Sequence, residues 1–142
     1  MEIRNALDSD ALVIKELLEQ LGYPSTEEFL RQRLNELSAH PDHLDVVFVD
    51  GIDVSGFLSM HFIPQIAFDS SYAVISYLIV DQRLRSKGIG KSLEEFAVRE
   101  ARSRNCTRIF LHSNVRRADA HRFYLKQGYE EYAKTFIKYL SD

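Results

Sequence analysis

Apolar residues along the chain alternate between two spacings, one typical of helices and one typical of strands. Helical spacing occurs in four stretches: Leu12–Leu21, Phe29–Leu37, Ile89–Ala101 and Ala120–Leu125. Strand-like runs lie at Ile3–Ala6, Leu44–Val49, Val54–Phe62, Val74–Val80 and Ile109–Leu111, and β-rich sequence from Tyr129 to Tyr139 predicts one or two final strands. The pattern therefore predicts an α/β or α+β fold in which helices flank a mixed sheet.

Polar and glycine residues mark the expected ends of these elements. Ser25 and Glu28 have the spacing of a capping box, so we expect the second helix to begin there. Asp119 is expected to cap the last helix, which Gly128 would end. The dipeptide at positions 50–51 (Asp-Gly) predicts a tight turn between two strands of a hairpin, and a loop is expected over residues 63–71.

A basic, glycine-containing turn separates the apolar run that ends at Val80 from the helical pattern that begins near Ile89. It reads Arg85-Ser86-Lys87-Gly88-Ile89-Gly90 and is followed by Lys91. The two glycines allow the main chain to approach a ligand closely, and the first N–H groups of a helix have no partner within it. These donors and the positive end of the helix dipole favour an anion such as a phosphate.

The spacing of this turn distinguishes between three kinds of phosphate site. A nucleotide P-loop needs a glycine where Arg85 stands, and a dinucleotide fingerprint needs one where Leu93 stands. The turn instead resembles the pyrophosphate turn of the GNAT acetyltransferases, with Arg85, Gly88 and Gly90 at the motif positions. That resemblance implies acetyl-coenzyme A as the ligand; the alternative is an ordinary strand-to-helix turn with a solvated basic face.

A second stretch, Ser113 to Tyr129, resembles another motif of the same family. An asparagine follows the fifth strand, and Ala-x-x-Phe-Tyr-x-x-x-Gly-Tyr runs along the last helix, from Ala120 to Tyr129. By resemblance, Tyr124 would protonate the departing thiolate and Asn114 would bind the pantetheine arm. The alternative is that Tyr124 is an aromatic core residue.

The resemblance extends over nearly the whole chain and implies a GNAT fold whose sheet is splayed between strands 4 and 5. It also implies that main-chain groups of Leu78, Ile79 and Val80 hold the pantetheine amide. Donors to the pyrophosphate would come from Arg85, Ser86, Lys87, Gly88, Ile89, Gly90, Lys91 and Ser92.

Composition narrows the classes of partner. We expect the 142 residues, 1–142, to form one domain, and 45% hydrophobic with 27% charged residues is typical of a globular protein. The net charge of -3 argues against general binding to nucleic acid or membranes. We expect a cytoplasmic protein, because no apolar run is long enough for a membrane span and the start does not resemble a signal peptide. The single cysteine, Cys106, excludes an internal disulfide, and no metal site is expected.

Acetyl transfer to an amine requires an uncharged amine, and many relatives place a glutamate on the central strand as the base. Here Val74, Ser76 and Tyr77 occupy the corresponding positions. Tyr77, His61 and His112 are therefore the candidates for moving a proton, since histidine titrates near neutral pH. The alternative for each histidine is a packed or surface side chain.

The C-terminal half most resembles the aminoalkylphosphonate N-acetyltransferases, which implies a small primary amine as acceptor, with a possible anionic group. The alternatives are acetylation of a protein N-terminus or lysine, and a non-catalytic module that binds or senses acyl-coenzyme A. The aromatic residues from Tyr129 to Tyr139 could join a homodimer or belong to the sheet of the domain itself.

Overall fold

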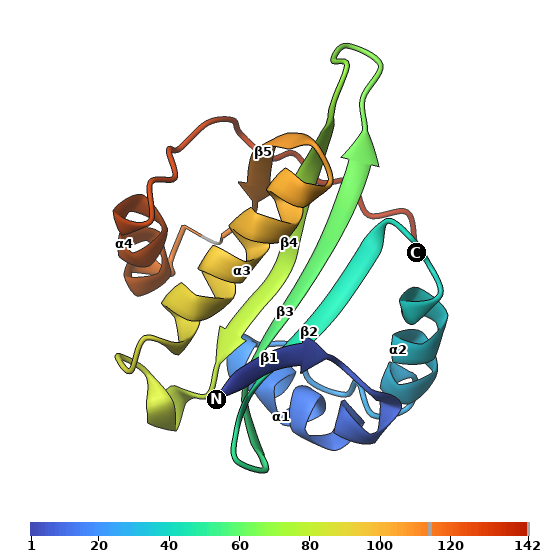
Figure 1. The fold of residues 1–142 in the computed structure, drawn as a ribbon, viewed down its shortest axis with the longest axis vertical. Helices are drawn as coiled ribbons and strands as arrows, with labels where there is room; N and C mark the ends of the chain where they lie inside the picture. The colour runs from blue at the N-terminus through green and yellow to red at the C-terminus, as the bar shows by residue number, and fades with distance from the viewer. Residues whose placement is uncertain (114, 142) are drawn as a thin grey trace. The chain divides into compact units, whose positions relative to one another are not determined.

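A computed structural model describes residues 1–113 and 115–141 of the chain (Figure 1). These residues form two compact units, Met1–Leu111 and His112–Asp142. The first unit contains a five-stranded sheet and three helices, and the second contains one helix followed by a segment without regular structure. The expectation of a single domain over 1–142 stays a prediction.

The sheet has the strand order β1-β2-β3-β4-β5. Its strands are β1 (Glu2–Asn5), β2 (His43–Asp50), β3 (Asp53–Pro64), β4 (Ser71–Val80) and β5 (Cys106–Leu111). The first four pair antiparallel, whereas β4 and β5 pair in parallel. This mixed sheet confirms the predicted fold class.

Helices cover both faces of this sheet (Figure 1). They are α1 (Ala11–Leu21), α2 (Leu30–Ser38) and α3 (Ile89–Ser103), with short 3-10 turns η1 (Asp8–Asp10) and η2 (Gln82–Leu84). The last helix, α4 (Ala118–Lys126), belongs to the second unit.

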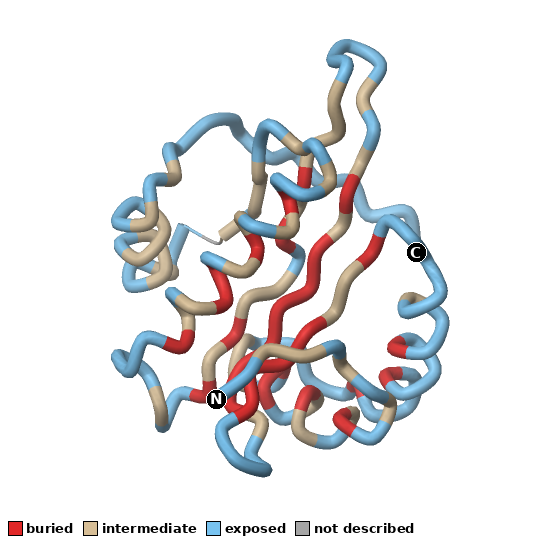
Figure 2. Tube along the Cα trace, in the orientation of Figure 1, coloured by how far each residue is buried: buried red, intermediate tan, exposed pale blue. Residues whose placement is uncertain are grey.

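Successive side chains along the strands point to opposite faces of the sheet, and two cores form, one on each face (Figure 2). In β2, Val46 and Phe48 pack in the core beneath α3, whereas Val47 and Val49 pack in the core beneath α1 and α2. Leu93 of α3 is fully buried in the first of these cores.

The parallel pair ends early, so the sheet opens between β4 and β5. Pairing runs from Ser71 opposite Cys106 to Ile75 opposite Leu111, and β4 then continues to Val80. Within residues 1–113, the second half of β4 has no strand partner on this edge, as the predicted splay requires.

One extra residue interrupts the pairing of β4 with β3. Ser59 pairs with Tyr77 and Met60 pairs with Ile75, which leaves Ser76 as a β-bulge. As a result, Ala73 and Ile75 face the core beneath α3, but Tyr77 and Ile79 face the opposite side.

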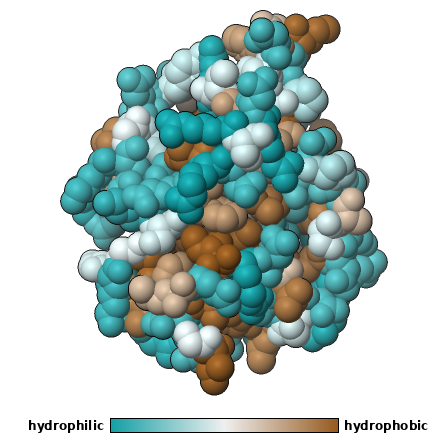
Figure 3. Space-filling view, in the orientation of Figure 1, coloured by the Kyte–Doolittle hydropathy of each residue, from teal (hydrophilic) through white to brown (hydrophobic). Residues whose placement is uncertain are grey.

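The hairpin between β3 and β4 has an apolar tip. Its loop is shorter than expected, because β3 extends to Pro64 and β4 begins at Ser71. Ile66 and Phe68 in this loop are exposed, and apolar atoms lie at the upper end of the view in Figure 3, where Figure 1 places the loop.

Three local predictions were wrong. Helix α2 begins at Leu30 rather than at the Ser25 capping box, because Ser25 takes a left-handed conformation (φ 64°) instead of the extended one that a cap needs. Asp119 lies inside α4 and makes no side-chain cap. Residues 129–141 form no strand; β propensity alone is insufficient where no neighbouring strand pairs with the backbone.

Candidate functional site

The turn between β4 and α3 has the features of an anion-binding helix start. Gly88 precedes the helix in a left-handed conformation (φ 82°), and a Cβ atom there would meet no atom within 4 Å. The first bond into the helix runs from the N–H of Ser92 to the carbonyl of Gly88, at 3.0 Å. The N–H groups of Ile89, Gly90 and Lys91 therefore belong to the first turn, which a helix leaves without internal partners.

Asp81 fixes the beginning of this turn. Its carboxylate accepts hydrogen bonds from the backbone N–H of Arg83 (3.0 Å) and from the guanidinium of the same residue (2.7 and 3.1 Å). Its own N–H donates to the carbonyl of Ser55 at 2.9 Å, which ties the turn to β3. These hydrogen bonds from Arg83 lower the pKa of Asp81 from 3.8 to about 2.

Gly56 allows α3 to lie close to the sheet beneath the turn. A Cβ at this position would lie 2.9 Å from Leu93 Cδ1, 3.1 Å from Ile89 Cγ2 and 3.3 Å from the carbonyl oxygen of Ile79. Contacts below about 3.4 Å force a neighbour to move. The position of the first helical turn therefore depends on a missing side chain in β3.

The basic side chains of the turn differ in how far they are engaged. Arg83 pairs with Asp81, and Lys91 lies 3.9 Å from Glu95 one helical turn away. Arg85 and Lys87 are exposed. An incoming anion would thus meet the backbone donors together with mobile, solvated cations rather than a rigid cage of side chains.

The predicted backbone contacts of Leu78, Ile79 and Val80 lie beside this turn. These residues pair with Leu58, Phe57 and Gly56 of β3, and their other edge is the one from which β5 has diverged. An exposed strand edge offers N–H and C=O groups to an extended ligand.

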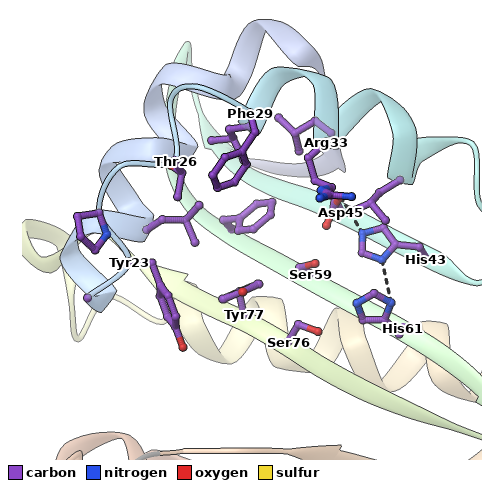
Figure 4. A pocket seen from close by; sticks show the side chains of 17 residues that line it. Tyr23, Thr26, Phe29, Arg33, His43, Asp45, Ser59, His61, Ser76 and Tyr77 are labelled. Carbon is purple, nitrogen blue, oxygen red and sulfur yellow. Dashed lines mark hydrogen bonds and ion pairs between the residues drawn. The ribbon is translucent and has the colours of Figure 1, made fainter. Parts of the chain in front are cut away.

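A cavity of about 530 Å³ opens on the face of the sheet that α1 and α2 cover (Figure 4). Its apolar wall comes largely from the two helices and the segment between them. Its polar lining comes from Tyr23, Thr26, Arg33, His43, Asp45, Ser59, His61, Ser76 and Tyr77. Sequence reasoning identified Tyr77 and His61 as candidates, and the structure brings these two to the same cavity.

His43 and Asp45 were missed because their role depends on strand register. His43 pairs with His61 and Asp45 pairs with Ser59, so the four side chains share one face of the sheet. The signal in the sequence is the polar alternation at positions 43 and 45 and again at 59 and 61, beside apolar runs of the same strands.

The two histidines and the aspartate are in contact. His43 Nδ1 lies 3.1 Å from His61 Nδ1, and His43 Nε2 lies 2.8 Å from Asp45 Oδ2. The latter contact has the distance of an ion pair but not the alignment of a hydrogen bond. Burial and the neighbouring His43 lower the pKa of His61, and Asp45 raises it in part.

Tyr77 is half-buried in the cavity and packs edge-on against Tyr23, with ring centres 5.5 Å apart. Burial raises the pKa of Tyr77 above its usual 10, with a smaller contribution from Tyr23. The phenol therefore keeps its proton at neutral pH, which suits a hydrogen-bond donor better than a base.

The remaining predicted site residues belong to the second unit. Tyr124 lies in α4, edge-on to Phe123 and Tyr129 at 5.4 and 5.7 Å, and burial raises its pKa. His112 is exposed, and its Nδ1 lies 3.0 Å from Thr135 Oγ1. Asn114 lies outside the described residues.

In the described parts of the chain, no helix is both long and apolar enough to cross a membrane.

Comparison with known proteins places the chain among acetyltransferases. Residues 11–129 match the model of the acetyltransferase (GNAT) family. An aminoalkylphosphonate N-acetyltransferase of Salmonella typhimurium is 29% identical over 144 residues, covering 98% of this chain and 91% of the relative.

Solved structures of similar fold include a GNAT family acetyltransferase of Staphylococcus aureus and the glucosamine-6-phosphate N-acetyltransferase of Arabidopsis thaliana. The first has a TM-score of 0.83 with 25% identity, covering 98% of both chains. The second has a TM-score of 0.86 with 25% identity, covering 99% of this chain and 98% of the other.

Proposed function

The chain belongs to the GNAT acetyltransferase family, and from that premise we propose that it transfers the acetyl group of acetyl-coenzyme A to the primary amine of a small molecule. The transfer would occur by direct attack of the amine in a ternary complex. The observation that carries this proposal is the turn between β4 and α3, where Gly88 and the first-turn N–H groups suit a diphosphate.

The residues present fit acetyl-coenzyme A. The pyrophosphate would bind the backbone from Arg85 to Ser92, and the pantetheine arm would follow the edge of β4 at residues 78–80. Asn114 is a further proposed contact of this arm, by resemblance to the family. The thioester carbonyl is the electrophile that this cosubstrate supplies. Open space above Gly88 and the unpaired edge of β4 support this assignment.

The acceptor amine would enter the cavity beneath α1 and α2. A volume of about 530 Å³ suits a small molecule. Arg33 lines the cavity and could bind an anionic group of the acceptor. The Salmonella relative is named for aminoalkylphosphonates, which combine a primary amine with such an anion.

Proton transfers would be carried out by tyrosine and histidine side chains. Tyr124 would donate a proton to the departing thiolate; its raised pKa keeps that proton in place at neutral pH. His61 and His112 remain the proposed groups for taking a proton from the amine, and Tyr77 would relay a proton through water.

Release of free thiol from acetyl-coenzyme A tests the proposal. We suggest 2-aminoethylphosphonate and glucosamine 6-phosphate as small acceptors, together with a peptide that has a free N-terminus and an internal lysine. Acetyl-coenzyme A binding is measured separately by calorimetry. Thiol release with a small amine supports the proposal, and release only with the peptide indicates a protein acetyltransferase.

Tight binding without thiol release from any acceptor would indicate a sensor of acyl-coenzyme A. The sensor alternative is supported by the lack of a glutamate at positions 74, 76 and 77 of the central strand, where many relatives have their base. Failure to bind acetyl-coenzyme A at all would refute the site assignment.

A homodimer is a further part of the proposal. Its support is the C-terminal segment, in which Phe136 and Tyr139 are exposed. Sedimentation analysis at several protein concentrations would detect the dimer.

A further inference from the structure

The polar cluster of Asp45, His43 and His61 forms a line along one wall of the cavity (Figure 4). We propose that His61 accepts a proton from the acceptor amine, and that His43 and Asp45 hold it in the tautomer that makes this possible. The inference rests on the proposed function, because the proton comes from the amine that is to be acetylated.

Strand register brings the three side chains together. Along the same face of the sheet, apolar side chains give way to polar ones where the cavity opens. On the same sheet face, the next residues along β2 and β3 are Val47 and Phe57, which are buried in the core beneath α1 and α2. The lining changes to His43, Asp45 and His61 where the cavity opens. The side chain of His43 is only 3% exposed, so this cluster is a built part of the cavity wall.

The distances determine the position of each proton. A bare lone pair on His43 Nε2 would be repelled by the Asp45 carboxylate oxygen 2.8 Å away, so the proposal assigns the ring proton of His43 to Nε2; the contact is electrostatic, without the alignment of a hydrogen bond. With its single proton on Nε2, His43 has a lone pair on Nδ1. Because the two Nδ1 atoms are 3.1 Å apart, His61 must donate the proton between them from its own Nδ1.

This assignment leaves Nε2 of His61 as an acceptor. Figure 4 shows the His61 ring between His43 and Ser76, on the side of the cavity that Tyr77 also lines. An amine, or a water bound to it, can deliver a proton to this nitrogen. The Asp45 carboxylate thus sets the tautomer of His61 through His43, which lies between them.

The proton balance of the step is simple. The ammonium N–H bond breaks and a new N–H bond forms at His61 Nε2, while the electron pair remains on the amine nitrogen for attack on the thioester carbonyl. The proton on His61 Nδ1 can then move to His43 Nδ1. The positive charge ends on the imidazole that lies 2.8 Å from the Asp45 carboxylate.

The charged groups that face the cluster act in opposite directions. Arg33 from α2 disfavours a second positive charge in the cavity, whereas Asp45 from β2 favours one. Tyr77 from β4 is a neutral phenol at pH 7, because burial raises its pKa, and Tyr23 from the segment after α1 packs edge-on against it. Burial and His43 lower the pKa of His61, so its ring is neutral and able to accept a proton at pH 7.

Nitrogen-15 spectra of labelled histidine side chains test the tautomers without any acceptor. The expected result is the Nε2–H form for His43 and the Nδ1–H form for His61, each assigned by loss of its signals in His43→Gln and His61→Gln. Asp45→Asn should mix the tautomers of His43. An Nε2–H tautomer for His61 would overturn the proposal, because its accepting nitrogen would already be occupied. His40→Gln, at an exposed position, is the matched control.

The second test is kinetic and uses an acceptor whose acetylation releases thiol from acetyl-coenzyme A. His61→Gln should lower kcat/KM for the amine by about 100-fold or more, with acetyl-coenzyme A affinity unchanged. Asp45→Asn should move the acidic limb of the pH profile of kcat/KM to lower pH, because Asp45 raises the pKa of His61. His43→Gln should move the limb to higher pH, because His43 lowers that pKa.

The outcomes separate the two proposals. If wild type releases no thiol with any acceptor, the proposed function fails, and the role of His61 in acetyl transfer fails with it. If wild type is active and His61→Gln retains full kcat/KM, only the inference about His61 fails. Unshifted pH profiles in both the Asp45 and His43 variants would likewise refute their positioning role.

Discussion

Replacing Asp81 by asparagine removes the charge that holds the start of the turn between β4 and α3. The carboxylate is buried, with 6% of the residue exposed, and it receives three hydrogen bonds from Arg83. Asparagine can still accept the backbone N–H of Arg83 but loses the ion pair. We expect the variant to be less stable at pH 7 and to bind acetyl-coenzyme A several-fold more weakly.

The lowered pKa of Asp81 sets an upper limit for the loss of stability. A drop from 3.8 to about 2, at roughly 1.4 kcal/mol per pKa unit, corresponds to about 2.5 kcal/mol. The Arg83 side chain is 80% exposed, and solvent screening weakens such pairs, so we expect about 1 to 2 kcal/mol.

The pH dependence has a definite sign. Because folding lowers the pKa, the carboxylate stabilises the protein above pH 3.8, and this stabilisation is lost as the pH falls toward 2. The advantage of wild type over Asp81→Asn should be nearly complete at pH 4 and reduced to about half at pH 3.

Urea unfolding at pH 7, 4 and 3 measures these differences. Asp50→Asn, which alters an exposed aspartate in the hairpin turn, is the control. Arg83→Gln removes the partner, so the double variant should lose less than the sum of the single changes. Equal stability of Asp81→Asn and wild type at pH 7, or an advantage of wild type that grows on acidification, would refute the reasoning.

The remaining predictions concern the turn, its support and the last helix. Gly88→Val should weaken acetyl-coenzyme A binding at least about tenfold by calorimetry, whereas Gly51→Val, also at a left-handed position in open space, should lose similar stability but keep its affinity. Gly56→Val should cost about 1 to 3 kcal/mol in urea unfolding, because its side chain collides with Leu93 and Ile89; an unchanged midpoint would contradict this packing. Tyr124→Phe should lower kcat about 100-fold without changing acetyl-coenzyme A affinity, and full activity would exclude the proposed acid; Tyr132→Phe is the control.

The turn could be predicted from the sequence because its chemistry is local. Gly88, Gly90 and the surrounding basic residues lie within a few positions of one another, at a junction that hydrophobic periodicity already marks. The fold class followed from the same periodicity, since the order of helices and strands limits the layers that can form.

The cavity could not be predicted in full because it depends on contacts between strands. His43 and His61 are 18 positions apart, and only the register of β2 with β3 makes them neighbours. The lack of strand structure in residues 129–141 has a related cause, because a strand requires a pairing partner as well as suitable side chains.

The single inserted residue in β4 reverses the parity of the strand. Before Ser76, odd-numbered side chains such as Ala73 and Ile75 are enclosed beneath α3; after it, the even-numbered Leu78 and Val80 take over that role. A charged substitution along β4 should therefore disturb the core beneath α3 at odd positions before Ser76 and at even positions after it. An alignment gap placed at this residue would exchange the two faces of the strand, and so the two cores, in any comparison of relatives.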